Sequence, residues 1–195
     1  MKFIIAFLIL TNSFVFASAS KSTKCEVELE SDDMELHWEA YKLPAPNKTG
    51  VKGTLRNLGL KEEYKGESIE KILDGMEFNI DARSVWTRNS MRDAKLVKFF
   101  FGKMVGGTYI KGKIIKLHEN SMKVLINMNG LSKEAVLKVT RKEQRLVAEG
   151  TIDILDWAMD KSLAALNKAC FDLHKGKTWS DVSIKLMLSY ENNCD

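Results

Sequence analysis

Cys170 and His174 are the pair of residues whose types and spacing most readily suggest chemistry. They stand four residues apart, so on a helix both side chains would face the same side and could hold one metal ion or take part in redox chemistry. A zinc or haem site needs further ligands, and the other histidines, His37 and His118, each stand alone in a segment with strand patterning. We therefore expect no metal site and interpret the pair as a contact between helix and sheet. A redox-linked enzyme that acts on a quinone or a stress product through this region is the alternative.

Other patterns associated with catalysis are incomplete. Lys175-Gly176-Lys177-Thr178 ends like a phosphate-binding loop, but Phe171 stands where that pattern requires its first glycine. The sequence holds no G-x-S-x-G elbow and no H-E-x-x-H helix. Asp153 and Asp156 could act as a carboxylate pair, but a solvated strand end explains them as well. We expect a binding protein that is not an enzyme and needs no cofactor.

Strand patterning accounts for most of the chain. Alternation of apolar and polar residues over short runs predicts eight strands, at residues 36–41, 51–57, 76–86, 108–117, 122–128, 135–139, 146–154 and 182–188. Asn129-Gly130 predicts a tight hairpin between the fifth and sixth strands, and Gly53 and Gly112 predict bulges or corners. Several short strands joined by turns favour an antiparallel barrel or sandwich, and eight strands favour a closed barrel able to hold one small ligand.

Three short helices interrupt the strands. Glu67 to Leu73 carries apolar residues at helical spacing, and Asp160 starts a longer helix that ends near Gly176. The third helix follows the 76–86 strand, where Ser90 and Asp93 have the spacing of a capping box. Its stripe is formed by Leu96, Phe99 and Phe100. This apolar helix next to an amphipathic sheet predicts a cover over an apolar cavity.

The first residues predict a secretory signal peptide over 1–19. Lys2 supplies a positive charge, residues 3–10 are apolar, and Ala17-Ser18-Ala19 forms the cleavage site. The remaining residues, 20–195, suit one exported domain, and no second apolar segment predicts stable membrane insertion. With 30 basic and 26 acidic side chains interspersed, a net charge of +4 does not predict a nucleic-acid surface.

Three cysteines, Cys25, Cys170 and Cys194, leave at least one thiol without an internal partner. Cys25 precedes the first predicted strand and Cys194 follows the last, and these two strands would be neighbours in a closed antiparallel barrel. We therefore predict a disulfide between Cys25 and Cys194, with Cys170 as a buried free thiol on a helix face.

Several segments, in this order, resemble the YceI-like family of bacterial exported lipid-binding proteins. They are residues 35–42 (ELHWEAYK), 50–55 (GVKGTL), 79–87 (NIDARSVWT), 92–100 (RDAKLVKFF) and 127–133 (NMNGLSK). The resemblance covers nearly all of the mature chain. It implies an eight-stranded, lipocalin-like barrel in the periplasm, which holds a polyisoprenoid such as a prenyl quinone or a prenyl pyrophosphate.

The inward phase of the strands and the cover helix then give a set of candidate ligand-binding residues. The predicted cavity lining is Trp38, Leu55, Met76, Phe78, Ile80, Leu96, Phe99, Phe100, Val124, Ile126, Leu137 and Ile184. Arg83, Arg88 and Arg92 are candidates for contact with a polar head group. An isoprenoid lipid is the expected partner, and a homodimer is left open. A filled barrel that binds a protein partner is the other alternative.

Overall fold

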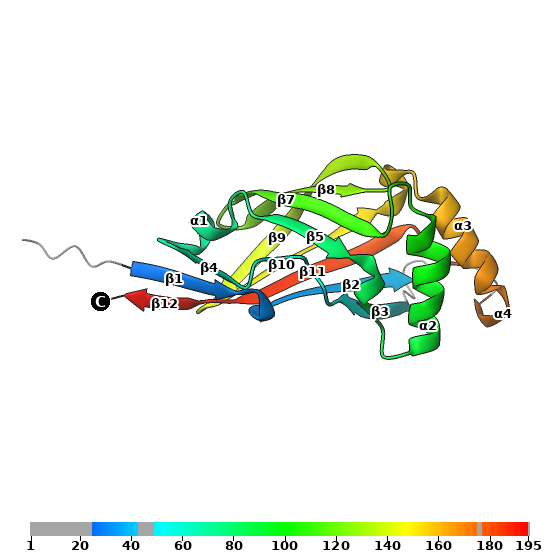
Figure 1. Cartoon of the computed structure of the whole chain (residues 1–195), viewed down its shortest axis with the longest axis horizontal. Coiled ribbons are helices and arrows are strands. Elements are labelled where there is room, and N and C mark those ends of the chain that lie inside the picture. Colours follow the sequence, from blue (N-terminus) through cyan, green and yellow to red (C-terminus); the bar gives the residue numbers. More distant parts are fainter. Residues whose placement is uncertain (1–24, 43–48, 175–176, 195) are drawn as a thin grey trace, which may run out of the picture.

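A curled antiparallel sheet forms the body of the protein (Figure 1). We describe a computed structural model of the chain, which gives residues 25–42, 49–174 and 177–194. The predicted signal peptide, residues 1–19, lies outside the described residues. In spatial order, the large sheet consists of β5 (Glu77–Asp81), β7 (Tyr109–Leu117), β8 (Ser121–Met128), β9 (Leu131–Lys142), β10 (Arg145–Asp153), β11 (Asp181–Ser189), β2 (Met34–Tyr41), β3 (Gly50–Leu55) and β6 (Val85–Trp86).

The two ends of this strand order meet through the chain that follows β3. The backbone amide of Asp81 donates to the carbonyl of Asn57 at 3.0 Å, and that of Asn79 donates to the carbonyl of Leu58 at 3.2 Å. These bonds join β5 to the chain beyond β3, so the sheet closes on itself. The predicted fold class, a mainly β antiparallel barrel of the lipocalin type, is confirmed.

The number of strands differs from the prediction of eight. Each predicted segment lies in the large sheet, but the 76–86 segment is divided into β5 and β6 by a 3-10 turn at Ala82–Ser84. The Asp81 side chain accepts a hydrogen bond from the amide of Arg83 at 3.0 Å, which stabilises this turn. As a result, β5 pairs with β7, whereas β6 pairs with β3.

A second, three-stranded sheet was not predicted. It consists of β12 (Glu191–Cys194), β1 (Cys25–Glu30) and β4 (Glu63–Gly66), in that order. Cys25 and Cys194 therefore lie within strands instead of outside them. They are direct partners in the antiparallel ladder between β1 and β12, and opposite residues in such a ladder lie within the Cα separation that a disulfide requires.

The glycines predicted as bulges lie in regular pairing. Gly53 pairs with Trp38, and Gly112 pairs with Ile126. The one shift of register in the pairing of β7 with β8 falls between Ile114 and Lys116. A Cβ on Gly53 would lie 2.5 Å from the Cζ2 atom of Trp38, so the glycine is required because the indole ring lies over it.

The three predicted helical regions are present. They are α1 (Ile69–Leu73), α2 (Ser90–Lys95) with its continuation, and α3 (Asp160–Ala169) followed by α4 (Phe171–His174). α2 and α3 lie across one end of the large sheet (Figure 1). The capping residue of α2 is Asn89, whose side chain accepts from the amide of Arg92 at 3.0 Å. Asp93 accepts instead from the amide of Thr87, at 2.9 Å.

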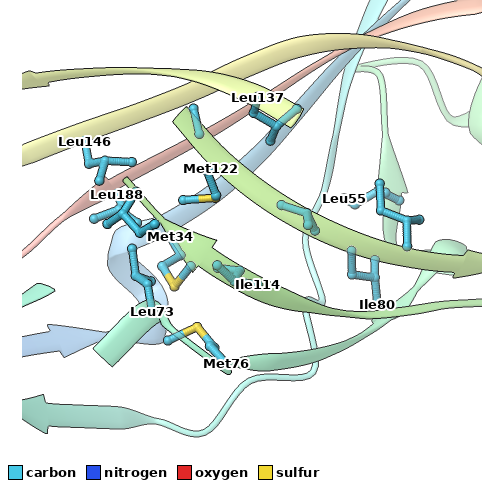
Figure 2. Close-up of a cluster of buried hydrophobic side chains, with 14 of the residues drawn as sticks. Met34, Leu55, Leu73, Met76, Ile80, Ile114, Met122, Leu137, Leu146 and Leu188 are labelled. Carbon is cyan, nitrogen blue, oxygen red and sulfur yellow. The ribbon is translucent and has the colours of Figure 1, made fainter. Parts of the chain in front are cut away.

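Side chains fill the barrel at the end opposite to α2 and α3. Leu29 of β1, Leu73 of α1, Met122 of β8 and Leu146 of β10 are completely buried. Figure 2 shows side chains from several strands of this cluster pointing to a common interior. This packed end anchors the small sheet and α1 and leaves the remaining interior to the cavity described next.

Candidate functional site

An apolar cavity lies inside the barrel, between the packed end and the helical cover. Its volume is about 200 Å³. The pleat of each strand turns alternate side chains inward, and all the predicted lining residues except Phe99 line it: Trp38, Leu55, Met76, Phe78, Ile80, Leu96, Phe100, Val124, Ile126, Leu137 and Ile184.

The chemistry of the wall is uniform. Thr178 is the one residue with a hydroxyl among the described lining residues, and none of them carries a charge. Burial of an unpaired charge in such surroundings costs much free energy. The cavity is therefore suited to hydrocarbon.

The cover begins with a π-helical segment. α2 continues into η3 (Leu96–Phe100), a π-helix, and then into the 3-10 turn η4 (Phe101–Lys103). A π-helix has more residues per turn than an α-helix, so it shifts the face of every later residue. Leu96, Phe100 and Phe101 line the cavity, whereas Phe99 does not. The predicted α-helical stripe of Leu96, Phe99 and Phe100 therefore becomes a stripe that omits Phe99 and includes Phe101.

The second half of the cover is α3. Leu163 and Leu166 of this helix also line the cavity. The Nζ atom of Lys95 donates to the carbonyl oxygen of Ala169 at 3.4 Å, which joins the end of α2 to the end of α3. The two helices thus act as one lid-shaped element over the barrel.

Asn129, at the tip of the hairpin between β8 and β9, ties this cover to the sheet. Its Nδ2 atom donates to the carbonyl oxygens of Trp157 at 2.8 Å and Ala158 at 3.0 Å, just before α3. Its Oδ1 atom accepts from the amide of Val105 at 2.7 Å, just after η4. A residue predicted only as part of a turn therefore holds both halves of the cover.

Two tryptophans bring polar atoms close to the cavity. Trp38 and Trp179 both line it, and the indole nitrogen of each is buried without a hydrogen-bond partner in the described parts of the chain. A buried donor without a partner costs about 1 to 3 kcal/mol. A ligand oxygen that reached either nitrogen would remove this cost.

None of the three predicted head-group arginines lies among the described cavity-lining residues. Arg83 donates to both carboxylate oxygens of Asp81, from Nε at 2.9 and 3.1 Å and from a terminal nitrogen at 2.7 Å. These hydrogen bonds hold the pKa of Asp81 below its ordinary value. Arg92 lies on α2, and Arg88 lies beside the ring of Trp86, 5.5 Å from its centroid.

The Cys170 region was the alternative candidate for chemistry. Cys170 is a half-buried free thiol at the junction of α3 and α4. The side chain of His174 lies outside the described residues, so the predicted pairing with Cys170 stays open. Within residues 25–42, 49–174 and 177–194, no three His, Cys, Asp or Glu side chains gather in a way that could hold a metal ion.

Sequence patterns missed several lining residues for a physical reason. Leu58, Leu60 and Trp179 all line the cavity, but they lie outside the strands, where no alternation marks the inward side. Apolar residues next to a glycine or a strand end, such as Leu58-Gly59-Leu60, were the available signal.

Fold and site together define a barrel with an apolar internal cavity. A model of the YceI-like domain family matches residues 24–189 of this chain. The match spans most of the sequence, so the protein belongs to the YceI-like family. No curated protein matches it.

Several solved structures share the fold, among them the following two. One is a polyisoprenoid-binding domain from Saccharophagus degradans, described as implicated in plant cell wall breakdown. It is 13% identical, has a TM-score of 0.57, and the match covers 86% of this chain and 98% of that one. The other is BcnA of Burkholderia cenocepacia, 11% identical with a TM-score of 0.55, and the match covers 84% and 99% of the two chains.

Proposed function

We propose that this protein binds a polyisoprenoid lipid, with the prenyl tail in the barrel cavity. It carries or stores this lipid and does not catalyse a reaction. The observation that carries this proposal is the cavity itself, whose described lining is apolar apart from Thr178 and free of charge. Membership of the YceI-like family supports it. The domain from Saccharophagus degradans that shares the fold is a polyisoprenoid-binding domain, which adds to that support.

Burial of the tail supplies the binding free energy. At about 25 cal/mol per Å², removing about 400 Å² of prenyl surface from water contributes about 10 kcal/mol before the costs of ordering. Few polar contacts are then needed for retention. A methionine-rich wall suits a flexible tail because thioether side chains adapt their shape, and Met34, Met76, Met122 and Met128 all line the cavity.

The periplasm is the proposed location. The charged start, apolar run and cleavage site at residues 1–19 support export. Within the part of the chain that the structure describes, no helix combines the length and the apolar character needed to cross a membrane.

Titration of the mature protein with a long-chain prenyl quinone tests this function. We expect saturable binding with one site per chain. Quenching of tryptophan fluorescence should report this binding, because Trp38 and Trp179 line the cavity. Fatty acids of shorter length serve as the comparison ligands. Failure to bind any prenyl lipid would contradict the proposal.

A further inference from the structure

The barrel wall has a window between β2 and the chain after β3. The register of this strand pair begins at Leu36 and Leu55. Beyond Leu55 the chain turns away from β2 and bonds to β5 through Asn57 and Leu58. The chain before β2 and the chain before β4 come together again where the amide of Ser31 donates to the carbonyl of Glu62 at 2.9 Å. We call the opening between Ser31–Leu36 and Leu55–Leu60 the window.

The local sequence fixes this departure from β2. The amide of Asn57 donates to Oγ of Ser84 at 3.0 Å, and Oδ1 of Asn57 accepts from the amide of Gly59 at 3.1 Å. Gly59 has a φ of +64°, and a Cβ at this position would lie 2.3 Å from the carbonyl oxygen of Asn79. The chain is thus held against β5 by contacts that only glycine permits, so the window is a built part of the fold.

A hollow of about 660 Å³ lies in the window. Five residues line both this hollow and the internal cavity: Met34, Leu36, Leu55, Leu58 and Leu60. These side chains border both spaces. A prenyl tail that passed between these side chains would have its polar end in the hollow.

Cationic groups gather on one side of the hollow. The guanidinium of Arg56 lies 3.7 Å from the centroid of the Trp86 ring, and that of Arg88 lies 5.5 Å from the same centroid. All three residues line the hollow. Neither arginine forms an ion pair with a described carboxylate, in contrast to Arg83, which is paired with Asp81. Stacking on an aromatic ring orders a guanidinium and leaves its N–H groups free to donate.

The opposite side of the hollow carries acidic residues. Asp32 and Glu35 lie there, and Glu35 is bonded to His37 at 2.7 Å. Attraction to the guanidinium groups and repulsion from these carboxylates would place an anionic group beside Arg56 and Arg88. Guanidinium groups bind phosphate oxygens in a bidentate way, whereas the described wall of the internal cavity holds no charged group that could do so.

We propose that the window holds the polar end of the ligand and that Arg56 and Arg88, ordered by Trp86, bind its phosphate or pyrophosphate group. This inference rests on the proposed function, since it concerns the head group of a prenyl ligand whose tail fills the cavity. It assigns Arg56, which the sequence analysis did not single out, and it selects Arg88 from the three arginines predicted there.

Two ligands with the same tail test the inference: geranylgeranyl pyrophosphate and geranylgeraniol. The unmodified protein should bind the pyrophosphate at least about tenfold more tightly than the alcohol. The Arg56→Gln/Arg88→Gln double variant should lose this preference and keep its affinity for the alcohol. The Lys142→Gln/Arg145→Gln variant removes the same charge from exposed positions of β9 and β10 outside the window and should keep the preference.

The salt dependence gives a second readout that needs no variant. Pyrophosphate affinity should fall as ionic strength rises, while alcohol affinity stays constant, because exposed ionic contacts are screened. Equal affinity for the two ligands, or a preference that survives in the Arg56/Arg88 variant, would overturn the inference and leave tail binding intact. The buried indole nitrogens of Trp38 and Trp179 would then be the donors to examine. Binding of neither ligand would overturn the proposed function itself.

Discussion

At the scale of single residues, the inward side chains of β8 give the sharpest control over the cavity. Ile126 is buried and lines it, while Val136 on the neighbouring strand β9 is 67% exposed on the outer face. Both are β-branched aliphatic residues in strands, so they differ mainly in the side of the sheet they face. A large side chain introduced at Ile126 would fill the cavity, whereas the same side chain at Val136 would not. Comparison of the two variants therefore distinguishes filling of the cavity from a general effect of a large substitution.

Ile126→Trp should reduce the affinity for a prenyl lipid at least about tenfold, because the indole ring would occupy space that the tail needs. Overpacking should lower the free energy of unfolding by about 1 to 3 kcal/mol. Val136→Trp should leave both lipid affinity and unfolding nearly unchanged. Titration and urea denaturation of the two variants check this, and equal lipid affinities would contradict it.

Asp81 gives a pH dependence. Its pKa is lowered in the folded protein, first by the hydrogen bonds from Arg83. An unfolded aspartate titrates near pH 3.9, so the stabilisation is complete above about pH 5 and is lost as the pH falls through the lower folded pKa. Because the pair is near the surface, the loss should be under about 1 kcal/mol. Asp81→Asn should flatten the decline in unfolding free energy below about pH 5, and an unaltered decline would contradict this account.

At this scale, much of the cavity wall could be predicted. Alternation in β2, β5 and β8 indicated residues that line the cavity, including Trp38, Phe78 and Val124. Phe99 could not be placed correctly, because spacing rules assume an α-helix and the segment is a π-helix. Trp179 and Leu58 lie beyond regular strands, where the inward direction depends on tertiary contacts.

At the scale of elements, the hairpin of β8 and β9 supports the cover. Three hydrogen bonds of Asn129 reach the chain after η4 and the chain before α3. Asn127, two residues earlier, bonds only within the hairpin, to Ser132, among the hydrogen bonds of described residues. The two asparagines therefore distinguish support of the cover from stability of the hairpin.

Asn129→Gly should lower the free energy of unfolding by about 1 to 3 kcal/mol and speed the release of bound lipid, since the cover loses its attachment. Glycine is chosen because Asn129 has a φ of +53°, which glycine adopts without strain. Asn127→Ala should have less effect on stability and none on release. Stopped-flow measurement of lipid release checks this, and identical rates for the two variants would count against it.

Most strands and helices could be predicted from the sequence, but the residues at which they begin and end could not. The hairpin at Asn129-Gly130 and the helix at α1 follow from turn and spacing rules. The division of the 76–86 segment depends on Asp81 and Arg83 stabilising a turn, which alternation does not reveal. β4 and β12 have four residues each, too few to show alternation. β1 was missed although Val27 and Leu29 alternate with glutamates, and it pairs only with these two short strands.

At the scale of the whole molecule, β1 and β12 bring the two ends of the domain together. Their ladder places Cys25 opposite Cys194. A bridge there would close a loop of nearly the whole chain, the situation in which the entropic model of disulfides gives its largest effects. Cys170, a free thiol at the end of α3, is the natural control.

Peptide mapping under non-reducing conditions, on protein produced in an oxidising compartment, should recover Cys25 linked to Cys194. Cys194→Ser should lower the free energy of unfolding by about 2 to 5 kcal/mol, whereas Cys170→Ser should have little effect. Recovery of Cys170 in an internal bridge would show that the assignment is wrong.

The barrel as a whole could be predicted from eight amphipathic segments and the family resemblance, and the family is confirmed. The window could not, because it depends on the pairing of residues 56–58 with β5 instead of β2. Long-range pairing of this kind leaves no local pattern. The identity of the ligand likewise depends on the cavity and its rim more than on any motif.

The central claim is that the protein carries a prenyl lipid, and its direct test is the content of the native cavity. The full chain, residues 1–195, is produced in an exporting bacterial host, purified without detergent, extracted with organic solvent and studied by mass spectrometry. We predict about one prenyl lipid per chain, and almost none from Ile126→Trp. A repeatedly empty extract, together with no uptake of added prenyl quinone, would contradict the claim.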